Sequence, residues 1–119
     1  MDEATDRLLR RAYEAFNARD LDAALSTMHA DVDWPNAIEG GRVVGQGEIR
    51  RYWFAQFADA DPKVEPKTIR QLPDGRIEVS VHQVVRDLEG NVLSEGDVAH
   101  IYSLRDGLVE RMEIAEPAV

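Results

Sequence analysis

The sequence predicts an α+β domain in which N-terminal helices pack on a curved, mostly antiparallel sheet and close it into a cone around a pocket. Two observations predict this class. Helical patterns occupy the first half of the chain, and four β segments separated by turn residues occupy the second half. Helices first and strands later is the order of α+β proteins, not the alternation of a parallel α/β sheet. The 119 residues contain no repeat or linker, so one domain is expected over residues 1–119.

The first two helices are expected at residues 3–18 and 21–29. Apolar side chains recur at helical spacing on one face of the first helix, and charged side chains occupy the other face. Asp2 and Asp20 stand where N-caps belong, because an aspartate oxygen accepts hydrogen bonds from the free N–H groups of a first turn. His29 is expected to end the second helix, where the negative end of the helix dipole favours an imidazole.

A short strand and a third helix are expected in the middle of the chain. The strand covers residues 32–38 and is interrupted by Pro35. Proline cannot donate to a ladder, so this strand is expected to lie at an edge or to carry a bulge. The third helix covers residues 47–59, and Ile49, Trp53 and Phe57 share one of its faces.

The four β segments that follow are expected to form a meander of hairpins. They cover residues 64–72, 76–87, 93–104 and 108–115. The connections carry the residues that tight turns require, in Pro73-Asp74-Gly75, Glu89-Gly90-Asn91 and Asp106-Gly107.

Strand alternation separates side chains that face the core from those that face outward. In the segment 76–87 one face is apolar except for Gln83, and this face is expected to point inward. In the next segment the larger side chains, including Tyr102, share a face with His100. A polar group on an apolar face needs a partner, because burying it unpaired costs about 1–3 kcal/mol. Gln83 and His100 are therefore expected either to satisfy each other or to meet a ligand together.

The composition excludes several classes of function. The chain has 23 acidic and 14 basic residues and a net charge of −9, so neither nucleic acid nor an anionic membrane is an expected partner. Without cysteine there is no disulfide, thiolate catalysis or cysteine-ligated metal. The three histidines are spread over different elements or faces, and Gly45-Gln46-Gly47 is not followed by the third glycine of a dinucleotide loop, so no metal or cofactor is expected. The chain has no long apolar run and no signal peptide, which favours a cytoplasmic location.

Two stretches resemble the nuclear transport factor two-like (cystatin-like) superfamily, and within it the SnoaL-like proteins. The stretch from Ala12 to Asp22 is similar to the end of the long first helix and its turn into the second. The stretch from His100 to Val109 resembles the hairpin of the last two strands, and Trp34-Pro35-Asn36 and the Trp53 helix fit the middle of the pattern. The resemblance implies the same cone-shaped fold. It does not imply one activity, because the superfamily includes isomerases, cyclases, dehydratases, epoxide hydrolases and non-catalytic binding proteins.

Among these proteins, ketosteroid isomerase uses an aspartate base on the first strand and an oxyanion hole of a tyrosine and a protonated aspartic acid. In this chain the base position matches Trp34, and Asp33 beside it is expected on the opposite face of the strand. Counting back from Asn17, the tyrosine position falls on Ala12, and the protonated aspartic acid matches His100. The resemblance therefore does not carry the ketosteroid isomerase mechanism over to this chain.

His100 is the candidate catalytic residue, because a histidine can donate, accept or shuttle a proton near neutral pH. The alternative is a core histidine that bonds Gln83 or the backbone. Trp34 and Asn36 share a face of the first strand and are expected to serve as an apolar wall and a hydrogen-bond partner for a ligand. The other expected ligand-binding residues are Gln83, Tyr13, Trp53 and Tyr102.

Three functions remain open at the level of sequence. The first is a cofactor-independent isomerase, cyclase or hydratase that acts on a small, mostly apolar molecule through His100. The second is a pocket that binds such a molecule without turnover, and the third is a scaffold for protein interaction. A homodimer is also expected, by analogy with the superfamily, through the outer face of the segment 76–87, which carries Ser80, His82, Val84 and Arg86.

Overall fold

The fold is described by a computed structural model over residues 2–116. Its elements, in chain order, are α1 (Glu3–Asn17), α2 (Leu21–Leu25), β1 (Met28–Pro35), β2 (Arg42–Val44), α3 (Gln46–Asp59), β3 (Asp61–Gln71), β4 (Ile77–Arg86), β5 (Val92–Arg105) and β6 (Leu108–Ala115). None of the helices in this part of the chain is long and apolar enough to span a membrane.

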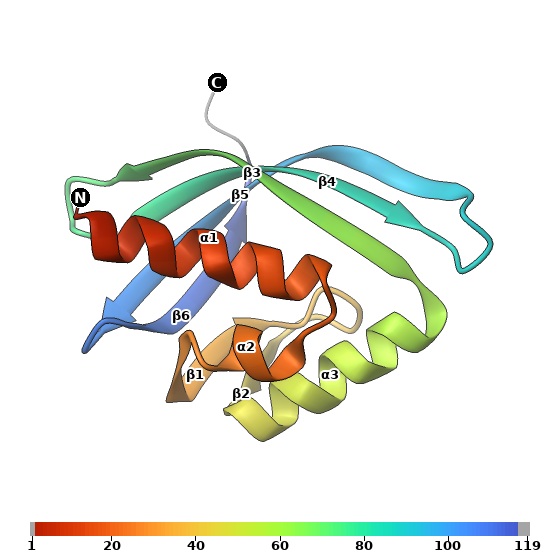
Figure 1. The fold of residues 1–119 in the computed structure, drawn as a ribbon, viewed down its shortest axis with the longest axis horizontal. Helices are drawn as coiled ribbons and strands as arrows, with labels where there is room; N and C mark the ends of the chain where they lie inside the picture. The colour runs from red at the N-terminus through yellow and green to blue at the C-terminus, as the bar shows by residue number, and fades with distance from the viewer. Residues whose placement is uncertain (1, 117–119) are drawn as a thin grey trace.

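Six strands form one sheet in the order β2-β1-β6-β5-β4-β3. All neighbours run antiparallel except β1 and β6, which are parallel. Figure 1 shows the long strands arching over α1, with α2 and α3 on the same side of the sheet. The sheet is curved but does not close on itself, since β2 and β3 are its edges. The predicted α+β class, with helices packed on a curved and mostly antiparallel sheet, is confirmed.

The helices begin where the sequence places their caps. The Asp2 side chain accepts a hydrogen bond from the backbone N–H of Thr5 at 2.8 Å, and Asp20 accepts one from Ala23 at 3.1 Å. The predicted end of the second helix at residue 29 is wrong, because α2 ends at Leu25. The hydroxyl of Thr27 donates back to the Ala24 carbonyl at 2.6 Å, which occupies one of the free carbonyls at the helix end.

The first strand lies earlier in the chain than predicted. It covers Met28–Pro35, not residues 32–38, so His29 belongs to β1 and not to a helix terminus. β1 is an inner strand between β2 and β6, so the edge alternative is wrong, and its register against β6 shifts between Met28 and Asp33. Pro35 fits because it is the last residue of the strand. The short strand β2 was not predicted.

The meander of β3 to β6 matches the prediction. β3 starts at Asp61 and includes two prolines, Pro62 and Pro66, which an edge strand tolerates because half of its N–H groups face away from the sheet. The last hairpin turns at Asp106 and Gly107, both with positive φ (54° and 77°), the conformation of a two-residue turn between twisted strands.

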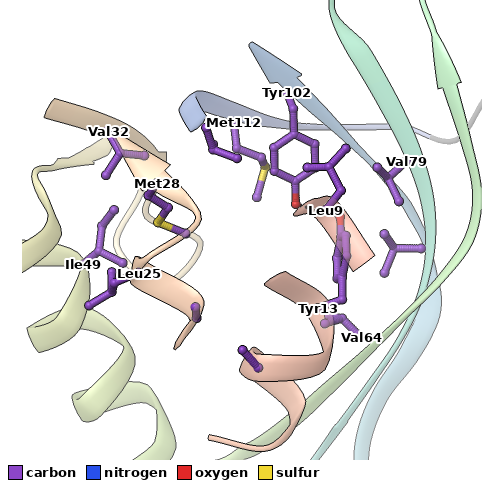
Figure 2. Packing of buried hydrophobic residues seen from close by; sticks show 14 of the residues in the cluster. Leu9, Tyr13, Leu25, Met28, Val32, Ile49, Val64, Val79, Tyr102 and Met112 are labelled. Carbon is purple, nitrogen blue, oxygen red and sulfur yellow. Dashed lines mark hydrogen bonds between the residues drawn. The ribbon is translucent and has the colours of Figure 1, made fainter. Parts of the chain in front are cut away.

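The core lies between the concave face of the sheet and the helices, as Figure 2 shows for its labelled members. Leu9, Val32, Ile49 and Val79 are fully buried, and they come from α1, β1, α3 and β4. Asn17 ties the end of α1 to β3, because its side-chain amide both donates to the carbonyl of Val64 (2.7 Å) and accepts from its N–H (2.9 Å).

Candidate functional site

A cavity of about 200 Å³ lies between the helices and the concave face of the sheet. Most of its lining is apolar or aromatic, and its polar groups are the side chains of Tyr13, Tyr52, Gln56, Gln83, His100 and Tyr102. Within residues 2–116, no aspartate, glutamate, lysine or arginine lines it, although the chain carries a net charge of −9. The remaining lining residues are Ala12, Phe16, Ala24, Met28, Trp34, Pro35, Ala37, Trp53, Pro62, Val64, Val98, Met112 and Ile114.

Three buried side chains form a hydrogen-bonded chain at the cavity wall. The Tyr102 hydroxyl donates to the Tyr13 hydroxyl at 2.7 Å, and the Tyr13 hydroxyl lies 2.7 Å from Nδ1 of His100. The rings of Tyr13 and His100 are nearly parallel, at 8°, with centroids 5.8 Å apart. Figure 2 shows Tyr102 pointing its hydroxyl toward Tyr13 across the core. The three groups come from α1 and β5, so the helix-to-sheet packing assembles them.

Burial sets the protonation state of this chain of groups. It lowers the pKa of His100 from 6.5 to about 4, because the charged imidazolium loses its hydration in the core. Burial also raises the pKa of Tyr13 and of Tyr102, whose ionised forms are disfavoured for the same reason. At neutral pH the cavity wall therefore presents a neutral imidazole and two neutral phenols.

Aromatic rings form the adjoining wall. Trp34 and Trp53 meet edge to face with ring centroids 5.7 Å apart, and Trp34 lies 6.4 Å from Tyr102. Trp53 is 2% exposed and half-buried Trp34 lies farther out. The exposed residues Ala37 and Ile114 complete the outer rim.

The side chains of Gln83 and His100 do not form a hydrogen bond with each other. Both line the cavity, as expected for side chains on the inner faces of β4 and β5. However, Gln83 is paired with Gly96, whereas His100 is paired with Val79, so the two side chains are offset by four residues, or about 13 Å, along the strands. The partner of His100 is Tyr13, and no hydrogen bond joins the Gln83 side chain to any other described residue. The cavity therefore separates them.

The sequence predicted that Asn36 shares a strand face with Trp34, and this prediction is wrong. β1 ends at Pro35, and the side-chain oxygen of Asn36 accepts hydrogen bonds from the N–H groups of Ile38 (3.1 Å) and Glu39 (2.9 Å) in the following turn. Asn36 is absent from the cavity lining, whereas Trp34 belongs to it. The asparagine is used to build the turn because β1 ends earlier than the pattern indicated.

Tyr52 and Gln56 line the cavity but were not singled out from the sequence. They lie one helical turn apart on α3, beside the apolar face that contains Trp53. Their i, i+4 spacing next to that face was the signal in the sequence that could have identified them as cavity residues. The Tyr52 hydroxyl accepts a hydrogen bond from the Ala37 N–H at 3.0 Å. The count from Asn17 placed the tyrosine position on Ala12, but the hydroxyl that reaches His100 is that of Tyr13, and both residues line the cavity.

Asp33 and His82 are not part of the cavity lining. Asp33 lies in β1 next to Trp34 but pairs with Arg42 at 2.7 Å and Arg111 at 2.6 Å, outside the cavity lining. His82 lies on the opposite face of β4 from Gln83, between Glu95 and Asp97, each at 2.8 Å. Those hydrogen bonds raise the pKa of His82. Residues 2–116 contain no cluster of three or more histidine, aspartate or glutamate side chains arranged to hold a metal ion.

Comparison with known proteins gives one family. The sequence model of the SnoaL-like domain matches residues 9–112. A comparison with curated protein sequences found no match.

Solved structures share the fold over almost the whole chain. TerC, co-crystallised with polyporic acid, is 25% identical, with a TM-score of 0.83, and the match covers 97% of this chain and 92% of TerC. An NTF2-like protein of unknown function from Burkholderia pseudomallei is 20% identical, with a TM-score of 0.83 and coverage of 98% and 92%. RV0760c from Mycobacterium tuberculosis, in complex with estradiol-17beta-hemisuccinate, is 15% identical, with a TM-score of 0.79 and coverage of 93% and 92%.

Proposed function

Because the chain belongs to the SnoaL-like domain family, we propose that its cavity binds a small, mostly apolar molecule that carries a polar oxygen. The observation that carries this proposal is the composition of the cavity: about 200 Å³ lined by aromatic and aliphatic side chains, with uncharged hydrogen-bonding groups and, among residues 2–116, no carboxylate, amine or guanidinium. Ligand pockets have this character, mostly apolar with a few polar groups that fix orientation. Structures of the same fold that contain polyporic acid and estradiol-17beta-hemisuccinate support it.

The size of the cavity sets the size of the molecule. An apolar cavity of about 150 Å³ holds one benzene ring. The larger volume here, about 200 Å³, suits a molecule of one to two fused rings, and His100, Gln83 and Gln56 are the groups placed to bind its polar atoms. The lack of charge in the lining favours neutral molecules over strong acids and bases.

The chain offers a direct readout of binding, because both of its tryptophans line the cavity. We would titrate the protein with 1-indanone, a neutral bicyclic ketone, following tryptophan fluorescence and calorimetry. The expected results are a saturable fluorescence change and, at a ligand concentration of about 100 times Kd, about 2.7 kcal/mol of added stability. The absence of a saturable change with 1-indanone would contradict the proposal.

A pair of aromatic truncations locates the binding. Trp34→Ala removes a side chain that lines the cavity. Phe54→Ala removes an aromatic ring that is 73% exposed and does not line the cavity. We expect Trp34→Ala to weaken binding measured by calorimetry, and Phe54→Ala to leave it unchanged. Equal effects of the two truncations would place binding outside the cavity.

A second candidate function is catalysis in the same cavity, as a cofactor-independent isomerase, cyclase or hydratase with His100 as the acid–base or hydrogen-bonding group. The chain of Tyr102, Tyr13 and His100 favours it, because preorganised donors stabilise charge that develops on a substrate oxygen. The test is deuterium exchange at the carbon next to the carbonyl of 1-indanone in D₂O. Acceleration that is lost in His100→Ala and kept in His82→Ala would support catalysis, and equal rates in the two variants would remove His100 from that role.

The alternative of an interaction scaffold with a filled cavity receives less support, since Gln83 and His100 line a cavity and do not face each other in a closed core. We retain two expectations from the sequence as proposals. The first is a homodimer through the outer face of β4, tested by light scattering, for which a monomeric mass is the contradicting result. The second is a cytoplasmic location, tested by cell fractionation.

A further inference from the structure

The direction of the hydrogen-bonded chain at the cavity wall determines what His100 offers to a ligand. Tyr102 is 2% exposed, and the only partner of its hydroxyl among the described residues is Tyr13. If the Tyr102 hydroxyl donates to Tyr13, the Tyr13 proton is left to bond Nδ1 of His100. Both tyrosine hydroxyl protons then have an acceptor.

The reverse direction is less favourable. If Nδ1 of His100 carried the proton and donated to Tyr13, Tyr13 would donate to Tyr102 and the Tyr102 proton would have no acceptor in residues 2–116. Each direction leaves one donor without a protein acceptor, which is the Tyr102 hydroxyl in this case and the Nε2–H of His100 in the first, and such a donor is costly where no acceptor can reach it. The structure has the Tyr102 hydroxyl donating to Tyr13, so the remaining donor is the Nε2–H of His100, a residue that lines the cavity. The geometry therefore makes Nδ1 the acceptor, and a neutral imidazole with an accepting Nδ1 carries its proton on Nε2.

The Nε2 atom faces accessible space. No described residue forms a hydrogen bond with it, yet no buried side-chain nitrogen or oxygen among the described residues is sealed without a partner. His100 is 6% exposed and lines the cavity, so the accessible space at Nε2 is the cavity. An N–H donor with no protein acceptor is thus directed at the position of a ligand.

We infer that Tyr13 positions His100 as a neutral Nε2–H donor, and that the cavity selects molecules with an acceptor oxygen, such as a ketone or quinone carbonyl, over molecules that present a donor there. This inference rests on the proposed function for its ligand but not for the state of His100. The lowered pKa of His100 agrees with a neutral ring at pH 7. In this arrangement Tyr13 is a positioning residue, since it acts on the ligand only through His100.

The state of His100 is tested without a ligand, by nitrogen-15 NMR of the three histidines, with His29→Gln and His82→Gln used to assign their signals. We expect the wild-type protein to show a protonated Nε2 and an unprotonated Nδ1 for His100. In Tyr13→Phe the donor to Nδ1 is lost, and a mixture of both tautomers is expected. In the matched variant Tyr102→Phe, Tyr13 can still donate to Nδ1, so the tautomer is unchanged. A protonated Nδ1 in the wild type would overturn the inference, and so would an unchanged tautomer in Tyr13→Phe.

The selectivity is tested by calorimetry with three bicyclic compounds of similar size: 1-indanone carries only an acceptor, indole only an N–H donor, and indane neither. One net hydrogen bond corresponds to about three- to tenfold in affinity, so 1-indanone should bind that much more tightly than indane, and indole no more tightly. Tighter binding of indole than of 1-indanone would overturn the inference. If none of the three binds, the proposed function fails, and the NMR measurement still decides the state of His100.

Discussion

Acidification is expected to destabilise this protein through His100, well above the pH at which carboxylates dominate. The perturbation is a fall in pH from 7 to 4. Burial holds the pKa of His100 at about 4 in the folded protein, against 6.5 for an exposed histidine. Between these values the unfolded chain binds a proton at this residue and the folded chain does not. The free energy of unfolding therefore falls as the pH falls from 6.5 toward 4, and the full stability is present above 6.5.

The magnitude follows from the width of this interval. Each pH unit between the two pKa values corresponds to about 1.4 kcal/mol, so the interval from 6.5 to about 4 corresponds to roughly 3 kcal/mol. A domain of this size has about 5–15 kcal/mol of total stability, so the loss is measurable. His82 acts in the opposite sense, because hydrogen bonds to Asp97 and Glu95 raise its pKa, and its contribution is lost as the pH rises.

The assay is urea unfolding of the wild type and of His100→Gln at several pH values between 7 and 4. Glutamine does not titrate, while His29, His82 and every carboxylate are present in both proteins, so the difference between the two unfolding free energies isolates His100. We expect that difference to change by roughly 3 kcal/mol over the range, with the wild type losing more stability on acidification.

Two results would refute this reasoning. The first is a difference between wild type and His100→Gln that stays constant from pH 7 to pH 4. The second is an NMR titration in which His100 shows the ordinary pKa of 6.5, which would mean that the imidazole keeps its hydration in the folded protein and is not buried as described above.

Three further predictions concern stability and are measured by chemical denaturation. Leu9→Ala should cost about 2–5 kcal/mol because Leu9 is fully buried, whereas Leu88→Ala, at a residue 65% exposed, should stay within about 0.5 kcal/mol, and equal costs would contradict the core described here. Asn17→Ala should cost about 1–3 kcal/mol, because it leaves both backbone groups of Val64 without their side-chain partner, and a neutral effect would show that water replaces it. Gly107→Ala should cost about 1–2 kcal/mol because φ is 77° at this turn, and a stabilising effect would contradict that conformation.

The sequence was sufficient for the features that depend on neighbouring residues. Helical spacing located α1 and α3, aspartates marked the starts of α1 and α2, and glycine-containing turns marked the hairpins. Alternation along β4 and β5 assigned Gln83 and His100 to the inner face, where both now line the cavity. These assignments succeed because the period of an element and the chemistry of its caps are local properties.

The failures lie where long-range pairing competes with local pattern. Met28 continues the apolar stripe of α2 and His29 was expected to end that helix, but the parallel pairing of β1 with β6 takes both residues into a strand. The same shift ends β1 at Pro35 and moves Asn36 into a turn. The sequence of residues 21–38 cannot indicate that pairing, because the partner strand, β6, begins at Leu108.

The site itself was decided by tertiary structure. Alternation shows which face a side chain takes, but not where it lies along the sheet, so the four-residue offset between Gln83 and His100 depended on the register of β4 against β5. The contact between Tyr13 and His100 joins residues 87 positions apart, on a helix and a strand that meet only when α1 packs into the curved sheet. The sequence by itself indicated an apolar inner surface that carries Gln83 and His100. Only the packing of α1 against β5 decided which partner that histidine has, because side chains distant in the chain meet through the fold alone.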